Sequence, residues 1–132
     1  MHTSGIVVVS SNASWSPQLS ILTYSATKVF ARYLAKALNW EMKVANMPVD
    51  ILCMSPSFVL TKMISHLKTP FNAISVEKCV STGLRDLGHE EETSGALIHE
   101  ATSVYAAFMG KYMGDIEYKI RRMLLQKGGS SG

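Results

Sequence analysis

Tyr24 and Lys28 are the residues of this 132-residue chain whose types and spacing first suggest chemistry. They lie four positions apart in TYSATKVF, residues 23–30, and on a helix both side chains would project from one face about one turn apart. A free tyrosine has a pKa near 10, so a tyrosine that transfers protons near neutral pH needs a neighbouring cation. A cation about 4 Å away supplies on the order of 4 kcal/mol at an effective dielectric of about 20, and Lys28 could be that cation.

Two further segments are expected to join this pair in one crevice. Ser11 ends a predicted strand thirteen positions before Tyr24, and Pro56, Val59 and Thr61 follow the next predicted strand. Ligands of an α/β sheet collect outside the carboxyl ends of its strands. Tyr24 would donate a proton to a carbonyl that receives hydride, Ser11 would hydrogen-bond the carbonyl oxygen, and a cofactor would supply the hydride.

Simpler interpretations of these residues stay open. An ordinary amphipathic helix start also places a tyrosine above a lysine, and a serine at a strand end often bonds only the backbone. Ser10 ends the same strand as Ser11, so the choice between them rests on spacing alone. His99 and Glu100 begin the zinc motif H-E-x-x-H, but position 103 is Ser103, and we predict no metal site.

The elements that must position these residues form an α/β pattern. The β-branched run at residues 5–11 predicts a strand buried on both faces of a parallel sheet, and residues 49–55 predict a second buried strand. Residues 24–44 between them predict a helix, because their apolar positions recur at near-helical spacing. Strand, helix and strand in this order are typical of a βαβ crossover.

The second half of the chain predicts more helix than strand. Residues 56–70 indicate a loop with a short helix, and Ser75 can cap a helix that Gly88 ends. Residues 94–100 fit either a third short strand or a helix. The remainder is expected to be mostly helical before a flexible 128–132 tail, with an apolar stripe made of Ile116, Ile120, Met123 and Leu124.

Composition favours one globular domain, residues 1–127, because 47% of the residues are hydrophobic and 17% charged. The net charge of +3 arises within residues 111–127, where five basic residues accompany two acidic ones. The neutral remainder argues against a nucleic-acid partner, which would need a basic stripe.

Two cysteines make neither a disulfide scaffold nor a zinc framework, and no apolar run is long enough to cross a bilayer. The basic tail is a candidate for contact with anionic lipid at a membrane surface.

The motifs IVVVSS, YSATK and SPSFVLTKM, in this order and spacing, resemble the C-terminal half of the short-chain dehydrogenase/reductases. They are most similar to the branch of the very-long-chain 3-oxoacyl-CoA reductases and steroid 17β-hydroxysteroid dehydrogenases. The resemblance implies the C-terminal portion of a Rossmann-like, doubly wound parallel sheet. It also implies that Ser11, Tyr24 and Lys28 are the catalytic residues, that Tyr24 and Lys28 bind the nicotinamide ribose, and that Pro56, Val59 and Thr61 contact the nicotinamide.

The activity that the resemblance implies is NADPH-dependent reduction of a ketone to an alcohol. The expected substrate is a 3-oxoacyl-CoA or a ketosteroid, which belongs to fatty acid elongation or steroid metabolism. The resemblance also implies placement at the endoplasmic reticulum membrane and a homodimer formed through the helix at residues 24–44.

Three departures from the family pattern qualify this expectation. Many members have Pro-Gly where this chain has Pro56 and Ser57, but the fatty-acyl branch often carries other residues after this proline, so this departure favours that branch more than it counts against the function. No G-x-x-x-G-x-G follows a strand, so the usual pyrophosphate site has no counterpart, and the family's upstream asparagine has none either. The chain therefore resembles the second half of a longer enzyme. The alternative is a non-catalytic fragment that binds NADPH very weakly or not at all and acts, if at all, by pairing with a full-length relative.

Overall fold

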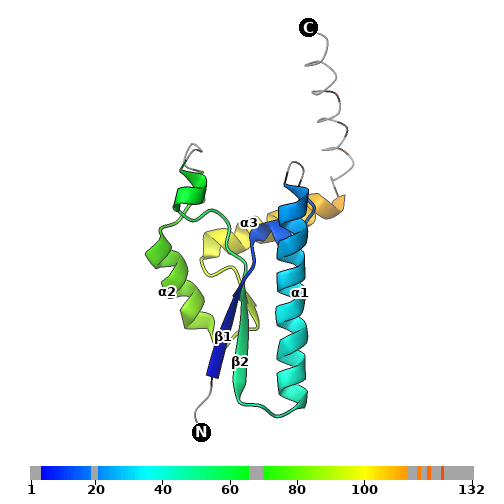
Figure 1. Cartoon of the computed structure of the whole chain (residues 1–132). Coiled ribbons are helices and arrows are strands. Elements are labelled where there is room, and N and C mark those ends of the chain that lie inside the picture. Colours follow the sequence, from blue (N-terminus) through cyan, green and yellow to red (C-terminus); the bar gives the residue numbers. More distant parts are fainter. Residues whose placement is uncertain are drawn as a thin grey trace.

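The computed structural model describes residues 4–18, 21–65 and 70–112, together with positions 116, 119 and 123. Its centre is a three-stranded parallel sheet in the order β1-β2-β3. Helix α1 lies along one side of this sheet and α2 along the other, while α3 crosses behind the ends of β1 and β2 (Figure 1). This arrangement confirms the predicted α/β class with a parallel sheet.

Strands β1, Ser4–Val9, and β2, Val49–Met54, are joined through helix α1, Leu22–Val44. The two strands pair in parallel along their whole length, in a register that sets Val8 opposite Cys53. This is the predicted βαβ crossover, and its helix begins two residues earlier than the spacing indicated.

The core lies between β2 and α1. Ile51 and Cys53 point to this face of the sheet and are buried with Ala35 of α1. Alternate β2 residues point to the opposite face, where α2 passes so closely above Met54 that a Cβ at Gly83 would overlap the methionine sulfur. The central strand is therefore buried on both faces, as predicted.

The prediction that the first strand is equally buried was wrong. Ile6 is 47% exposed and Val9 52%, because β1 pairs only with β2 within the described sheet and so lies at its edge. The β-branched run correctly indicates that β1 is a strand. Its burial would depend on a second neighbouring strand, which the described residues do not provide.

Short elements follow the predicted outline. The loop after β1 forms the 3-10 turn η1, Asn12–Ser14, and the loop after β2 contains a second one, η2, Lys62–Ile64. Ser75 Oγ accepts the Lys78 N–H at 3.2 Å and so caps helix α2, Val76–Asp86. Gly88, with φ of +81°, lies just beyond the helix end, as the capping pattern predicted.

Of the two predicted outcomes for residues 94–100, the helical one is confirmed for residues 97–100, which begin helix α3, Leu97–Tyr112. The strand outcome was wrong for this range, because the short strand β3, Glu92–Thr93, ends directly before it. Ile116 and Met123 of the predicted apolar stripe are exposed. Positions 120 and 124, the ends of the predicted 1–127 domain and the 128–132 tail lie outside the described residues. Among the residues that the structure describes, no helix combines the length and apolar character needed to cross a membrane.

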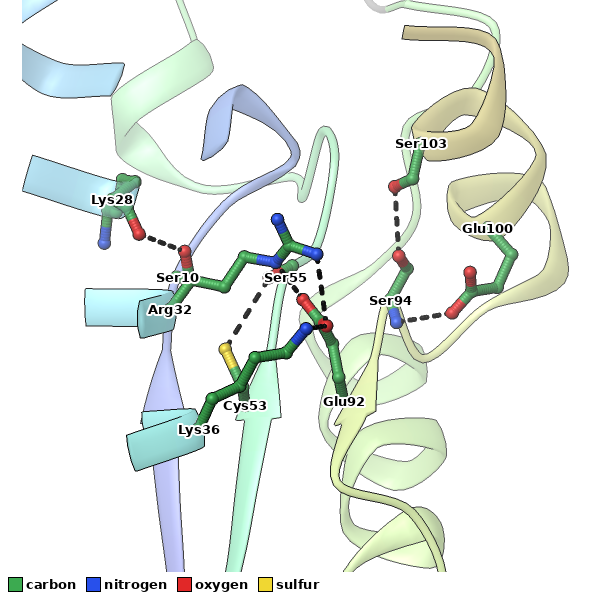
Figure 2. Close-up of polar contacts among 10 residues, drawn as sticks. All are labelled: Ser10, Lys28, Arg32, Lys36, Cys53, Ser55, Glu92, Ser94, Glu100 and Ser103. Carbon is green, nitrogen blue, oxygen red and sulfur yellow. Dashed lines mark hydrogen bonds and ion pairs between the residues drawn. The ribbon is translucent and has the colours of Figure 1, made fainter. Parts of the chain in front are cut away.

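Glu92 of β3 fixes α1 against the sheet. Its carboxylate accepts hydrogen bonds from Arg32 Nε and Nη2, and Lys36 Nζ lies 2.9 Å from the same carboxylate (Figure 2). Trp15 stacks on the guanidinium, with the Arg32 Cζ 3.7 Å from the ring. Burial opposes ionisation of Glu92, but the hydrogen bonds from Arg32 and Lys36 outweigh it, so the pKa of this carboxyl lies below its ordinary 4.5.

Replacement of Glu92 by glutamine should lower the free energy of unfolding by about 1–3 kcal/mol near neutral pH, because two partly buried cations lose their counter-charge. Glu91→Gln is the matched control, since Glu91 pairs with Lys43 in a more exposed position, and it should cost less than about 1 kcal/mol. Urea unfolding of both variants and the wild type would measure the difference.

The pH dependence of this difference follows from the lowered pKa of Glu92. A carboxyl whose folded-state pKa is depressed stabilises the fold above its unfolded pKa, and this stabilisation is lost as the pH falls through the folded pKa. The gap between wild type and Glu92→Gln should therefore shrink below about pH 4.5. A gap that stays constant between pH 7 and pH 3 would contradict the ion-pair account.

Candidate active site

The ends of β1 and β2 are held together beyond the last residue of either strand. The Ser10 N–H donates to the Met54 carbonyl at 2.8 Å, and the Asn12 N–H donates to the Pro56 carbonyl at 2.9 Å. These two bonds continue the parallel ladder, so Ser11 lies between residues that are bonded to the end of β2. The structure thus brings the Ser11 and Pro56 segments to one edge of the sheet, as the sequence predicts.

Ser10 and Ser11 differ in how their hydroxyls are used. Ser10 is 3% exposed, and its hydroxyl donates to the Lys28 backbone carbonyl at 2.8 Å (Figure 2). Ser11 is half-buried, and its Oγ accepts the Ala13 N–H at 3.2 Å, which caps η1. Within the described residues the Ser11 hydroxyl donates to no acceptor, so its proton is free for a ligand.

Lys28 is attached to the end of β1 at two points. Its backbone carbonyl accepts the Ser10 hydroxyl, and its ammonium donates to the Val9 carbonyl at 3.2 Å. An ammonium has three donors. In the described part of the chain only this one acceptor takes a hydrogen bond from it, which leaves two donors available.

Tyr24 lies one helical turn before Lys28 in the first turns of α1. The Lys28 Nζ is 5.6 Å from the centre of the tyrosine ring, which is within cation–π range. The Tyr24 side chain is half-buried, and its hydroxyl has no hydrogen-bond partner among the described residues. The Lys28 ammonium and the Tyr24 ring therefore lie close together, as their spacing predicts, and the tyrosine hydroxyl is free.

Val59 and Thr61 lie farther along the segment that follows β2. Val59 pairs with Ile74 in a parallel bridge, and Thr61 is an exposed residue that precedes η2. Across residues 4–18, 21–65 and 70–112, no hydrogen bond joins either of them to Tyr24 or Lys28. The described contacts join Lys28 to the end of β1 and to the Tyr24 ring. They join the segment around Ser11 to Pro56 through Asn12, while Val59 is tied to the chain that enters α2.

Unsatisfied polar atoms gather in the two segments that flank this edge. Asn12 Oδ1, Ser14 Oγ and Trp15 Nε1 in or beside η1, and Ser25 Oγ in α1, are buried without a hydrogen-bond partner. Such atoms raise the free energy of the folded state unless water or a ligand satisfies them. They indicate a place where polar ligand groups would be stabilised.

The cysteines offer no competing nucleophile. Cys53 and Cys79 are both buried and unpaired, and burial raises the pKa of each thiol. A raised pKa keeps the thiol protonated, whereas the thiolate is the reactive form.

Sequence reasoning missed the residues that support this edge from a distance. Arg32 and Glu92 lie 60 positions apart, and His99 contacts Ser57 across 42 positions. No local spacing encodes such contacts. His99 had a signal only in the incomplete zinc motif, and that motif does not describe what its side chain does here.

The pattern of the family described as short chain dehydrogenase matches residues 2–70. Very-long-chain 3-oxoacyl-CoA reductase from Mus musculus is 27% identical over 113 residues, which is 85% of this chain and 36% of that protein. The same enzyme from Rattus norvegicus is 30% identical over 99 residues, 74% of this chain and 31% of that protein. The chain thus spans about a third of the length of these curated relatives.

Two solved structures share the fold. One, from a study of 7β-hydroxysteroid dehydrogenase stereoselectivity, has a TM-score of 0.65 and 21% identity and covers 83% of this chain and 47% of that one. The other, a short chain dehydrogenase from Burkholderia cenocepacia in complex with NADP, has a TM-score of 0.67 and 23% identity and covers 84% and 49%. Both likenesses show that this chain has the fold of about half of each matched chain, which is a partial Rossmann-like sheet.

The two serines should respond differently to replacement by alanine. Ser10→Ala should lower the free energy of unfolding by about 1 kcal/mol, because the bond from the buried Ser10 hydroxyl to the Lys28 carbonyl is lost. Ser11→Ala should cost less, because only one bond to a three-residue turn is lost. Urea unfolding of both variants would test this difference, and a larger cost at Ser11 would mean that its hydroxyl, too, serves the fold.

Proposed function

Because this chain belongs to the short chain dehydrogenase family, we propose that it carries the catalytic half of an NADPH-dependent oxidoreductase that reduces a ketone to an alcohol. The observation that carries this proposal is the position of Lys28. Its ammonium is held at the end of β1 by the Val9 carbonyl and lies 5.6 Å from the centre of the Tyr24 ring. The two remaining donors of this ammonium and the free Tyr24 hydroxyl are available to a ligand.

In the proposed mechanism Tyr24 donates its phenolic proton to the substrate carbonyl oxygen. The charge of Lys28 stabilises the phenolate that remains, and its fixed position removes the need to reorganise during the reaction. The Ser11 hydroxyl donates to the same carbonyl oxygen as negative charge develops there. Ser10 contributes indirectly, because its hydroxyl holds the backbone of Lys28.

The nicotinamide cofactor would supply the hydride. Lys28, which has two free donors, and Tyr24 would bind the ribose hydroxyls, and Pro56, Val59 and Thr61 would line the nicotinamide. These assignments account for the nicotinamide end alone. The described residues contain no glycine-rich turn at a helix N-terminus, which is the usual pyrophosphate site.

The relatives favour one substrate class within this activity. The curated relatives are named as 3-oxoacyl-CoA reductases, so a 3-oxoacyl-CoA is our first choice and a ketosteroid the second. Trp15 is less available for the substrate than its place in the loop suggests, because its ring stacks on Arg32. Action at the endoplasmic reticulum membrane, lipid contact by the basic tail and homodimer formation through α1 belong to this proposal as well.

A second candidate function is pairing with a full-length relative without catalysis. Strand β1 is an edge of the described sheet, and α1 exposes Phe30, Tyr33 and Trp40. An unpaired strand edge is a template for another strand, and an exposed apolar helix face favours contact with a partner. Cofactor binding by the chain alone distinguishes the two functions.

Replacement of Tyr24 by phenylalanine should lower the rate of ketone reduction by about 10²-fold or more, because the proton donor is lost. The affinity for NADPH should change little. Tyr33→Phe is a matched control on the same helix, because Tyr33 is 75% exposed and faces away from the core. Steady-state reduction of a 3-oxoacyl-CoA by the protein from its own source, and by the same form carrying each substitution, would test this. Turnover retained in Tyr24→Phe would remove Tyr24 from the mechanism.

The 132-residue chain alone should bind NADPH very weakly or not at all, since the described residues offer no pyrophosphate site. Titration of NADPH fluorescence with the purified chain would measure this, and Lys28→Met would show whether any signal arises at the proposed site. Saturable low-micromolar binding that Lys28→Met removes would favour a self-sufficient enzyme. Absence of binding, with recovery when a full-length relative is added, would favour the pairing function.

A further inference from the structure

Two buried residues, Asn72 and His99, form a closed ring of hydrogen bonds with the half-buried Ser57 of the 56–61 segment. The Ser57 N–H donates to His99 Nδ1 at 3.3 Å, and His99 Nε2 lies 3.1 Å from the Asn72 carbonyl oxygen. The Asn72 Nδ2 donates to Ser57 Oγ at 3.1 Å, which closes the ring. Each member thus contacts both others, although they come from three separate parts of the chain.

The partners of His99 determine its tautomer. A carbonyl oxygen can only accept, so Nε2 carries the hydrogen, and a backbone N–H can only donate, so Nδ1 is bare. The imidazole is therefore neutral and has both nitrogens satisfied. His99 is 0% exposed and Asn72 5%, so the bond between His99 Nε2 and the Asn72 carbonyl oxygen is shielded from water. The two bonds of Ser57 are partly buried.

Helix α3 gives the ring a fixed support. Glu100, the next residue after His99, accepts the Ser94 N–H at 2.7 Å and so holds the start of the helix (Figure 2). The hydrogen bond between the Ser94 and Ser103 hydroxyls, 3.0 Å apart, involves no member of the ring. Thr102 donates to the His99 carbonyl at 2.9 Å and lies 3.4 Å from Asn12 Nδ2 in η1. The same turn of α3 therefore contacts both segments that end at the candidate site.

We infer that His99 is a positioning residue of the candidate site, an inference that rests on the proposed function. It holds Ser57, and through Ser57 the start of the 56–61 segment, at the place where Pro56 is bonded to Asn12. Ser57 stands where many members of the family have glycine. Its hydroxyl is the acceptor that completes the ring, and glycine would leave Asn72 Nδ2 without this partner.

The competing explanation is that His99 only fills the core. A packing role predicts that loss of the imidazole weakens the whole structure evenly. A positioning role predicts a local effect at Ser57. The neighbouring Ser55 amide provides the comparison, because it donates to the Thr93 carbonyl at 2.8 Å and has no bond to His99.

Amide hydrogen exchange of the full chain, read by NMR, tests the inference without cofactor or substrate. In His99→Phe the Ser57 amide should exchange at least about fivefold faster, while the Ser55 amide keeps its wild-type rate. His99→Gln, whose amide supplies an acceptor and a donor, should restore part of the protection. Ser103→Ala, which removes a buried hydroxyl from the same helix, should leave Ser57 unchanged.

Two outcomes would overturn the inference. One is an unchanged Ser57 exchange rate in His99→Phe, and the other is an equal acceleration at Ser55 and Ser57. If His99→Phe fails to fold, the tautomer of His99 in the wild-type chain labelled with ¹⁵N-histidine tests the two hydrogen bonds on which the inference depends. A neutral His99 protonated at Nε2 supports the ring, whereas a hydrogen on Nδ1 contradicts it.

Kinetics separate this inference from the proposed function. If the protein from its own source reduces a 3-oxoacyl-CoA with NADPH, the same form carrying His99→Phe should show a KM for NADPH raised at least about threefold. Ser103→Ala should leave this KM unchanged. If the wild type reduces no ketone, the proposed function fails, while the exchange measurements still decide whether His99 positions Ser57. An unchanged KM in an active His99→Phe variant would overturn the positioning role.

Discussion

The parallel pairing of β1 with β2 continues past the end of both strands, and the candidate site depends on this continuation. Bonds from Ser10 to Met54 and from Asn12 to Pro56 place the two departing segments at the same level of the sheet. A slip of one residue would turn every side chain of β1 to the opposite face, so that Ser10 could no longer reach the Lys28 carbonyl. The geometry of the site is thus set by a backbone ladder, and the side chains that perform chemistry are attached to it.

Charge fixes the remaining degree of freedom, the position of α1 above the sheet. Glu92 binds Arg32 and Lys36 one turn apart on this helix, so it limits both sliding and rotation. Because the carboxylate is largely shielded from water, its loss leaves two cations without compensation. Lys28 lies one turn before Arg32 on the same helix, and its placement is therefore linked to a residue of β3 that no proposed ligand touches.

The sequence predicts what is local and misses what depends on the assembled fold. Periodicity identified the βαβ unit, and a helical spacing of four identified Tyr24 and Lys28, because both signals follow from the geometry of one element. The burial of β1 was overestimated, since burial depends on neighbouring strands. Spacing could not separate Ser10 from Ser11, because the difference lies in a bond to Lys28, 18 positions away from Ser10. His99 contacts Ser57 and Asn72, which lie 42 and 27 positions away in the sequence, and no pattern in a single sequence indicates these contacts.

Met54 links the two sides of the sheet. Its carbonyl receives the Ser10 N–H at the site, while its sulfur lies under Gly83 of α2 with no room for an added carbon. An oxygen on that sulfur is comparable in size to a carbon, and methionine sulfoxide is polar as well. The folded chain protects Met54, which is 9% exposed, but an unfolded chain does not. Oxidation at this one atom would therefore place a polar oxygen at the packed contact between α2 and the sheet and weaken that contact when the chain refolds.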